Sequence, residues 1–463
     1  MAKPRSFAIR TFGCQMNEHD SERLAGLFVA DGLVPATSDA DADVIVFNTC
    51  TIRENADLKL YSALGQLKAL KEARPELQIA VGGCMAQRER GVIQERAGWV
   101  DVVFGTHNLA HAPQLLRRAQ TEGPLAEILD APEPEASRDM APALYAIREL
   151  PFAAWMTIQT GCDNTCAYCI VPSVRGGEIS RPMEDLVEEA RMLARSGVTE
   201  ITVLGQNVNS YGRDLTKRRP LFAELLRALG EVEGIERLRF TSPHPKDLRP
   251  ETIAAMAETP AVCPQLHLPL QSGSNRVLRG MRRGYTVERY LQRLGDARSA
   301  IAELAVTTDL IVGFPGETDR DFEETLEVVA QCEFDSTFTF IFSPREGTRA
   351  AELTNEFVGE DAIKARFERL KDVTDRSALR RNETRVAMTE EVLVEGPSRR
   401  DPAVYSGRTR QGKLIHFEPR GELRAGALVS VEVTSAAPHF LRGTQRDVLR
   451  APRHKIRLPL LIS

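Results

Sequence analysis

Three cysteines stand within eight residues, at Cys162, Cys166 and Cys169, in the spacing C-x3-C-x2-C. They follow an apolar run, 153–158, that is typical of a strand. Thiolates are soft ligands that hold iron–sulfur clusters, and a [4Fe-4S] cluster bound by three of them keeps one iron open for another ligand. A structural zinc ion is the alternative, but it needs a fourth Cys or His, and the next histidine is His244. The spacing therefore favours a cluster over zinc.

A second set of three cysteines lies in the first hundred residues. Cys14, Cys50 and Cys84 are 36 and 34 residues apart, and each follows a short apolar run, at 7–11, 42–47 and 77–81. Helical patterns at 21–30 and 55–73 separate these runs, and a fourth strand is predicted at 100–104. Such alternation predicts a parallel α/β sheet, whose strands end at one ligand-binding edge. A single cysteine there is usually a small buried side chain, but three at equivalent positions indicate a second cluster site.

A longer strand–helix alternation begins at residue 153. The predicted strands are 153–159, 199–205, 235–241, 265–270, 305–312 and 335–342, and the helical windows between them are 184–196, 220–230, 249–258, 287–303 and 318–332. A parallel array of this kind closes fully or partly into a barrel, with its chemistry at the carboxyl ends of the strands. The cysteines at 162–169 follow the first strand, so the pattern places them at that mouth.

Several polar segments follow these predicted strands. They include Gly176, Gly177 and Glu178, then Gln206 and Asn207, then Gln271 and Ser272, and finally Gly313. Turn chemistry explains each segment almost as well as ligand binding does. Cys263 and Cys332 lie outside both cysteine sets and are predicted to be core residues.

Charge is distributed unevenly along the chain. The net charge is −5, but residues 376–463 carry 17 Lys and Arg against 9 Asp and Glu, a balance of +8 that leaves −13 for the rest. Short alternating runs with Gly and Pro turns follow residue 390, which predicts a small antiparallel β-barrel. The asymmetry predicts a polyanion-binding module, with RNA contacts from Arg399, Arg400, Arg408, Arg410 and Lys413.

Composition adds weaker constraints. Apolar content of 42% and charged content of 27% are ordinary for a soluble protein. No apolar run has the length of a membrane span, and residues 1–5 lack the apolar core of a signal peptide. A cytoplasmic location with no membrane partner is therefore expected.

The cysteine motif resembles the signature of the radical S-adenosylmethionine (SAM) superfamily, in which the residue before the last cysteine, here Tyr168, is usually aromatic. Together with the N-terminal trio and the basic C-terminal barrel, it resembles the methylthiotransferase family, whose C-terminal module is called TRAM. The segments 11–17, 239–245 and 407–409 are similar to the tRNA branch of that family. The run 171–174 departs from related sequences, which often carry a tyrosine there.

The resemblance implies an α/β multidomain fold. We expect a Rossmann-like N-terminal domain at 1–118, a linker at 119–144, a partial (β/α)6 radical SAM barrel at 145–378, a TRAM domain at 379–450 and a tail at 451–463. It also implies two [4Fe-4S] clusters, an auxiliary one on Cys14, Cys50 and Cys84 and a radical SAM one on Cys162, Cys166 and Cys169. SAM contacts would come from Tyr168 and the polar segments at 176–178, 206–207, 271–272 and 313.

The implied reaction is methylthiolation of carbon 2 of N6-dimethylallyladenosine at position 37 of tRNA. SAM would serve both as methyl donor and as the source of a 5′-deoxyadenosyl radical. The implied partners are the anticodon stem-loop of tRNA, an electron donor such as flavodoxin or ferredoxin, and a sulfur source, with the protein acting as a monomer. The alternatives are a methylthiotransferase for threonylcarbamoyl-adenosine tRNA or for a ribosomal-protein aspartate, and a non-catalytic iron–sulfur RNA-binding protein.

Overall fold

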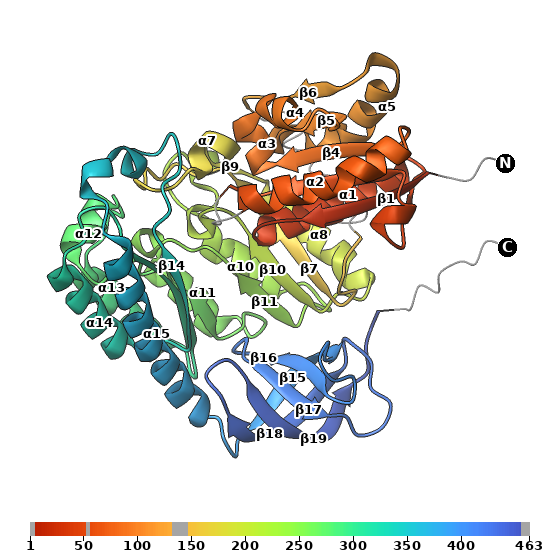
Figure 1. The fold of residues 1–463 in the computed structure, drawn as a ribbon. Helices are drawn as coiled ribbons and strands as arrows, with labels where there is room; N and C mark the ends of the chain where they lie inside the picture. Colours follow the sequence, from red (N-terminus) through yellow and green to blue (C-terminus); the bar gives the residue numbers. More distant parts are fainter. Residues whose placement is uncertain (1–4, 52–55, 132–146, 455–463) are drawn as a thin grey trace.

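A computed structural model describes residues 5–51, 56–131 and 147–454. Half of the predicted linker, 132–144, and most of the predicted tail, 455–463, lie outside these residues. Figure 1 shows an N-terminal sheet domain in red and orange, a central barrel in yellow to teal, and a small blue barrel at the opposite end. No helix in the described ranges is both long and apolar enough to cross a bilayer.

The N-terminal domain is a parallel sheet of order β2-β1-β3-β4-β5-β6. Its apolar strands are buried on both faces, as helices on either side require. The strands are β1 (Ser6–Thr11), β2 (Val34–Pro35), β3 (Val44–Thr49), β4 (Gln78–Gly83), β5 (Val102–Phe104) and β6 (Leu125–Glu127). The helices are α1 (Gln15–Ala30), α2 (Ala56–Ala73), α3 (Cys84–Glu89), α4 (Val92–Arg96) and α5 (Ala112–Glu122).

The end of this domain differs from the prediction. Helix α5 continues to Glu122, and β6 pairs in parallel with β5, so the sheet extends beyond residue 118 into the segment predicted as linker. The Pro- and Glu-rich composition after residue 123 concealed β6, because three residues are too few to show a strand pattern.

The central domain is a partial barrel of six parallel strands, as predicted. Two three-stranded sheets, β7-β10-β11 and β12-β13-β14, adjoin at a bridge between Leu238 and Val262. The strands are β7 (Ala153–Thr157), β10 (Glu200–Leu204), β11 (Arg237–Phe240), β12 (Gln265–His267), β13 (Ala305–Val312) and β14 (Ser336–Ile341), and a short hairpin, β8 (Gln159–Thr160) with β9 (Ile179–Ser180), follows β7. The helices are α7 (Val171–Arg175), α8 (Met183–Arg195), α9 (Arg213–Thr216), α10 (Phe222–Gly230), α11 (Pro250–Glu258), α12 (Asn275–Gly280), α13 (Val287–Ala300), α14 (Asp319–Cys332) and α15 (Glu360–Glu383).

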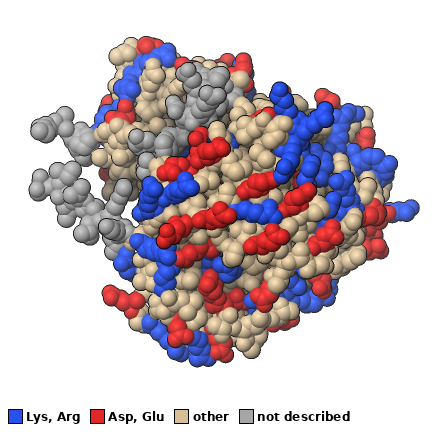
Figure 2. Space-filling view, turned by 180° about the vertical axis from the view of Figure 1, so that it is seen from behind, with Lys and Arg blue, Asp and Glu red and all other residues tan. Residues whose placement is uncertain are grey.

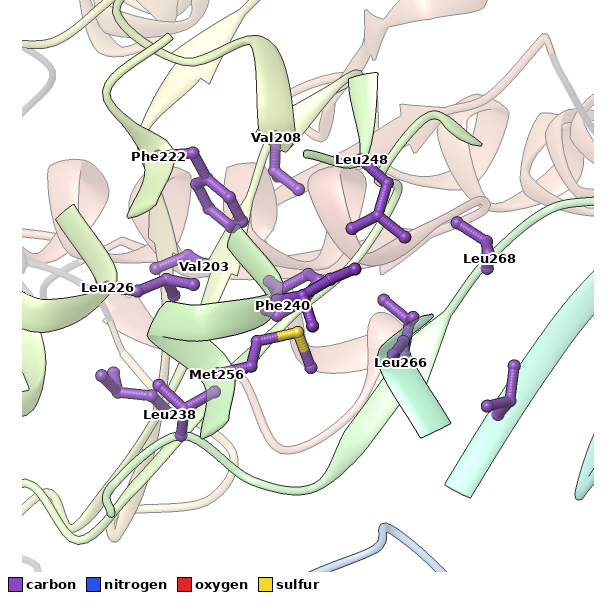
Figure 3. Packing of buried hydrophobic residues seen from close by; sticks show 14 of the residues in the cluster. Val203, Val208, Phe222, Leu226, Leu238, Phe240, Leu248, Met256, Leu266 and Leu268 are labelled. Carbon is purple, nitrogen blue, oxygen red and sulfur yellow. The ribbon is translucent and has the colours of Figure 1, made fainter. Parts of the chain in front are cut away.

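A single apolar core holds the barrel strands against their covering helices. Figure 3 shows Phe222 and Leu226 of α10 and Met256 of α11 packed on Val203 of β10 and Leu238 of β11. All of these side chains are buried. Cys332 lies in the same core and Cys263 is also buried, which confirms both as core residues.

The C-terminal domain is a closed barrel of order β15-β16-β17-β19-β18. Its strands are β15 (Thr389–Pro397), β16 (Tyr405–Thr409), β17 (Leu414–Glu418), β18 (Leu428–Ala436) and β19 (Leu441–Arg450). The predicted small antiparallel β-barrel is confirmed, with one exception in its pairing: β17 and β19 are parallel. The hairpin β18–β19 brings β19 back beside β17 in the same direction, a pairing that alternation along one strand does not reveal.

This barrel is attached to the amino-terminal ends of the central strands by buried arginines. Arg237, 2% exposed, donates to the carbonyl oxygens of Arg408 (2.8 Å) and Glu391 (3.1 Å). Arg239 donates to the carbonyl oxygens of Arg410 and Thr409, each at 2.9 Å. Charge-assisted bonds to backbone carbonyls are strong, so the two domains form one rigid contact.

Replacing Arg237 by Met should loosen this contact. The two carbonyl oxygens lose a buried charged donor, so we expect a loss of about 1–3 kcal/mol from the free energy of unfolding. Chemical denaturation followed by circular dichroism measures it. The matched control is Arg399→Met, which removes an arginine whose side chain is 95% exposed and should change nothing. Equal stability of the two variants would contradict this account of the interface.

Candidate functional site

The three N-terminal cysteines come together at the carboxyl edge of the first sheet. Cys14 precedes α1, Cys50 follows β3 and Cys84 begins α3. Gly13 has φ +145°, and a Cβ there would lie 2.8 Å from the Cβ of Cys50, so glycine permits the close approach of the two loops. The sequence pattern thus placed all three cysteines at one edge correctly.

Two asparagines fix these loops. Asn17 donates to the side-chain oxygen of Asn48 (3.1 Å) and to the carbonyl of Thr49 (2.9 Å), while Asn48 donates to the carbonyl of Asn17 (2.8 Å). The Cys14 Sγ lies 3.4 Å from Asn17 Oδ1. No local pattern indicates this pairing, because Asn17 lies in α1 and Asn48 lies in β3.

Burial controls the protonation of Cys84. It raises the pKa of the Cys84 thiol to about 11, Arg175 opposes that rise, and the neighbouring Cys50 and Cys14 add to it. A buried thiol beside two others stays neutral until a metal displaces its proton. The site is therefore suited to metal thiolate chemistry and not to a free nucleophile.

The second trio lies after β8 in a loop held by the barrel. The amide of Cys162 donates to the carbonyl of Gly176 (3.0 Å), and the amide of Ala167 donates to the carbonyl of Met281 (3.0 Å). Arg283, which is buried, places its guanidinium 3.2 Å from Cys166 Sγ. Sequence reasoning missed Arg283, since it lies in a loop after α12 that carries no motif.

Burial also raises the pKa of Cys169, to about 12, with Cys166 and Cys162 contributing and the amide of Val171 opposing. The trio is thus mutually close. Within the described ranges no three Cys, His, Asp or Glu converge tightly enough to hold a single metal ion. Thiolates on a cubane bind separate irons and so stand further apart than the ligands of one zinc ion. The donor set of each trio, three thiolates, is the one that iron–sulfur clusters use.

Polar atoms without partners gather at the mouth of the barrel. Among the described residues, both amide atoms of Gln206, Oδ1 of Asn207, Oε1 of Gln159 and Gln271, and Nε2 of His244 are buried and have no hydrogen-bond partner. Such atoms are rarely left unsatisfied. Their concentration at the carboxyl ends of neighbouring strands indicates that a polar ligand completes the site.

Glu178 lies at the same mouth. Its amide donates to Asp163 (3.0 Å), and its carboxylate lies 3.5 Å from the Asn207 amide nitrogen. Burial raises the pKa of Glu178. Gly161, at φ +78°, makes room for Gly176 and Gly177, because a Cβ there would collide with the Gly177 carbonyl. The glycines and Glu178 are thereby brought beside Cys162.

Three other predicted ligand contacts are occupied by the protein itself. Ser272 pairs with Thr325 (3.3 Å), and the Gly313 amide donates to Glu317 (3.0 Å). Tyr168 packs edge-on against Phe314, with ring centroids 6.4 Å apart. Ser272 and Tyr168 thus serve chiefly to shape the loops. Gln206, Asn207, Gln271 and Glu178 are the members of the predicted set that the mouth brings together.

The two trios meet across the domain boundary. Cys84 packs with Ile170 and Val174 in one buried cluster, and Ile170 follows Cys169 directly. The Thr106 hydroxyl donates to the Val174 carbonyl (2.7 Å), which ties the same helix, α7, to the N-terminal domain. The arrangement therefore places two three-thiolate sites on either side of one short helix.

The predicted RNA contacts divide into two groups. Arg399 and Arg400 are exposed, and Arg408 is partly exposed beside Glu395. Arg410 points toward the central domain at the Glu236 carbonyl, and Lys413, 9% exposed, pairs with Asp335 at 2.6 Å. Arg410 and Lys413 contact the central domain, so they are less accessible to RNA than Arg399 and Arg400 are.

Comparisons with known proteins agree with this architecture. Residues 156–329 match the model described as the radical SAM superfamily, and residues 6–105 match one described as uncharacterized protein family UPF0004. Two solved structures share the fold. They are the radical SAM methyltransferase TsrM from Kitasatospora setae (TM-score 0.52, 13% identity, 75% of this chain and 77% of that one) and the cobalamin-dependent SAM radical enzyme OxsB (0.50, 12%, 80% and 56%).

Curated relatives are much closer. A protein of Corynebacterium jeikeium is 50% identical over 94% of this chain and 86% of its own length. One of Acidothermus cellulolyticus is 52% identical over 96% and 88%, and one of Mycobacterium marinum 49% over 95% and 86%. The first two are named tRNA-2-methylthio-N(6)-dimethylallyladenosine synthase, and the third carries the same name with the number 1.

Proposed function

The chain belongs to the family of tRNA-2-methylthio-N6-dimethylallyladenosine synthases, which are radical SAM enzymes, and we propose that its two cysteine trios divide the reaction between them. The observation that carries the proposal is the meeting of the trios at α7, with Cys84 packed on the residue after Cys169. The protein is a tRNA-modifying transferase that uses two [4Fe-4S] clusters and SAM.

Cys162, Cys166 and Cys169 are assigned to the radical SAM cluster, which when bound and reduced would supply the electron that cleaves SAM to methionine and the 5′-deoxyadenosyl radical. The chain's own residues hold the sulfonium ligand. Glu178 provides a carboxylate for a cationic amine. Gln206 provides both of its amide atoms, and Asn207 and Gln271 provide their side-chain oxygens, none of which has a partner in the protein. Arg283 offsets the negative charge at Cys166.

Cys14, Cys50 and Cys84 are assigned to the auxiliary cluster. The pairing of Asn17 with Asn48 holds the loops that carry Cys14 and Cys50 together. This trio would hold the sulfur that is transferred, close to the base that the barrel mouth receives. A flipped-out base suits a mouth lined with amides, since its edge is read by hydrogen bonds.

The tRNA anticodon stem-loop is proposed to bind through exposed arginines of the small barrel, Arg399 and Arg400. On the face in Figure 2 acidic and basic side chains are intermixed over much of the surface. Many of the C-terminal arginines are paired, for example Arg408 with Glu395 and Arg450 with Glu236. Part of the basic charge of this segment is therefore neutralised by neighbouring carboxylates, and Arg399 and Arg400, whose side chains are exposed, are proposed to contribute to the RNA affinity.

Replacing Arg399 and Arg400 together by Ala should weaken RNA binding and leave the fold unchanged. Two phosphate contacts contribute about 0.7–0.9 each to the slope of log K against log salt, so the slope should fall by about 1.4–1.8. Filter binding of an anticodon stem-loop at several salt concentrations measures it. Glu418→Gln on the same barrel is the control and should not lower the slope. An unchanged slope in the arginine variant would mean that Arg399 and Arg400 do not contact the RNA.

Mass spectrometry of tRNA nucleosides tests the function directly. A strain lacking this gene should accumulate N6-dimethylallyladenosine without its 2-methylthio group, and the wild-type gene should restore it. If threonylcarbamoyl-adenosine or a ribosomal-protein aspartate lost the group instead, the assigned substrate would be wrong. Retained 2-methylthio product would exclude the activity altogether.

The remaining partners are proposed from the chemistry. The reaction consumes an electron and a sulfur atom, which calls for a small electron carrier such as flavodoxin or ferredoxin and for a sulfur source. Both trios belong to one chain, so a monomer suffices. A tRNA substrate argues for a cytoplasmic location.

A further inference from the structure

Arg175 lies between the two cysteine trios, and neither trio's assignment explains it. It ends α7, six residues after Cys169, and it is buried, with its side chain 8% exposed. Its guanidinium donates to Asp20 of α1 at 2.9 Å, and the Asp20 side chain is 9% exposed. The central domain thus inserts a buried cation into the N-terminal domain.

The surroundings of Arg175 are those of the auxiliary trio. Val174, its neighbour, packs on Cys84. Burial works against the charge of Arg175, but Cys84, Asp20 and Cys14 raise its pKa, and reciprocally Arg175 lowers that of Cys84. Arg23 and His107 also lie near enough to feel its charge. Arg175 is hydrogen-bonded to the carboxylate of Asp20, and its positive charge stabilises negative charge on the nearby thiolates.

A buried cation is costly unless negative charge is close by. Asp20 supplies one charge, and three thiolates on a cluster supply more. The potential of an iron–sulfur cluster depends on the net charge and hydrogen bonds around it. A fixed positive charge favours the reduced, more negative cluster, and the neighbouring carboxylate opposes it.

We propose that Arg175 is a positioning residue of the auxiliary site, which offsets the negative charge at Cys84 and Cys14 and so raises the reduction potential of the cluster they hold. This inference rests on the proposed function, since it requires a cluster on the N-terminal trio. It also explains why a residue of the radical SAM domain enters the N-terminal domain: the auxiliary site is complete only when both domains are docked.

The test measures the auxiliary cluster alone. In full-length protein with Cys162, Cys166 and Cys169 replaced by Ala, the remaining cluster is titrated with dithionite, and its one-electron reduction is followed by electron paramagnetic resonance. Arg175→Met should reduce the ratio of reduced to oxidised cluster at a fixed potential by about tenfold, a shift of about −59 mV. Arg175→Lys should restore most of the wild-type potential.

Asp20→Asn should shift the reduction potential in the opposite direction. It removes a negative charge beside the cluster and should raise the potential, whereas loss of a merely structural ion pair would move both variants the same way. Arg366→Met, which breaks the buried pair of Arg366 in α15 with Glu317 (2.8 Å), is the matched control and should leave the potential unchanged.

Each outcome decides the proposal. Opposite shifts in Arg175→Met and Asp20→Asn support it, and an unchanged potential or shifts of the same sign overturn it. If the Arg175→Met protein does not incorporate iron, the Asp20→Asn protein alone decides: a raised reduction potential supports the proposal, and an unchanged or lowered one overturns it. Absence of any cluster signal in the parent with three Ala substitutions would instead overturn the auxiliary cluster, and with it the proposed function.

Discussion

Cys50→Ala protein should still cleave SAM to 5′-deoxyadenosine in the presence of a reductant, and it should form no methylthiolated tRNA. Cys50 lies at the end of β3 in the N-terminal trio, whereas the radical SAM trio is held by bonds to Gly176 and Met281 in the barrel. Loss of an outer partner of a metal ligand already costs about 10–100-fold in affinity or activity, so loss of a ligand should cost at least about 100-fold in methylthiolation. Liquid chromatography of both products from one reaction measures the two activities together.

The iron content distinguishes this result from misfolding. Wild-type protein prepared anaerobically should hold about eight irons, as two [4Fe-4S] clusters require, and Cys14→Ala/Cys50→Ala/Cys84→Ala protein about four. Cys263→Ala, a buried cysteine outside both trios, should keep the full complement. Retention of the methylthio product by Cys50→Ala would remove the auxiliary role from this trio.

The second large effect is expected from Cys166→Ala. This substitution removes the sulfur that contacts Arg283. It should abolish 5′-deoxyadenosine formation, which depends on the radical SAM cluster. It should also abolish methylthiolation, which depends on the 5′-deoxyadenosyl radical. We expect each product to fall by at least about 100-fold, because loss of a metal ligand should cost more than the roughly 10–100-fold that loss of an outer partner costs. The same chromatographic assay measures it.

Cys332→Ala is the matched control for Cys166→Ala. Cys332 is buried in the barrel core on α14, so its removal costs stability through a small cavity and leaves the chemistry intact. A thermal shift with normal 5′-deoxyadenosine formation is the expected pattern. If Cys166→Ala retained cleavage of SAM, the three cysteines after β8 would not hold the catalytic cluster.

Much of the fold was predictable because its signals are local. Apolar runs of five to eight residues that alternate with helical patterns identify parallel strands, and all six barrel strands occur where the pattern placed them. Departures arose where the signal is short or non-local. The three residues of β6 are too few for a pattern, and the parallel pairing of β17 with β19 depends on how β18 returns.

The sequence by itself determined the chemistry: two cysteine trios at strand ends, a barrel to carry one of them and a basic domain after it. These three features follow from residue types and their spacing, which can be read from the sequence. The tertiary structure decided which charged side chains are exposed to a ligand and which pair within the protein. It paired Lys413 with Asp335, turned Arg410 toward the central domain, left Arg399 and Arg400 exposed, and brought Arg175 to Asp20. The physical reason is that ion pairing and burial depend on contacts between residues far apart in the chain, and these have no periodicity for a sequence to display.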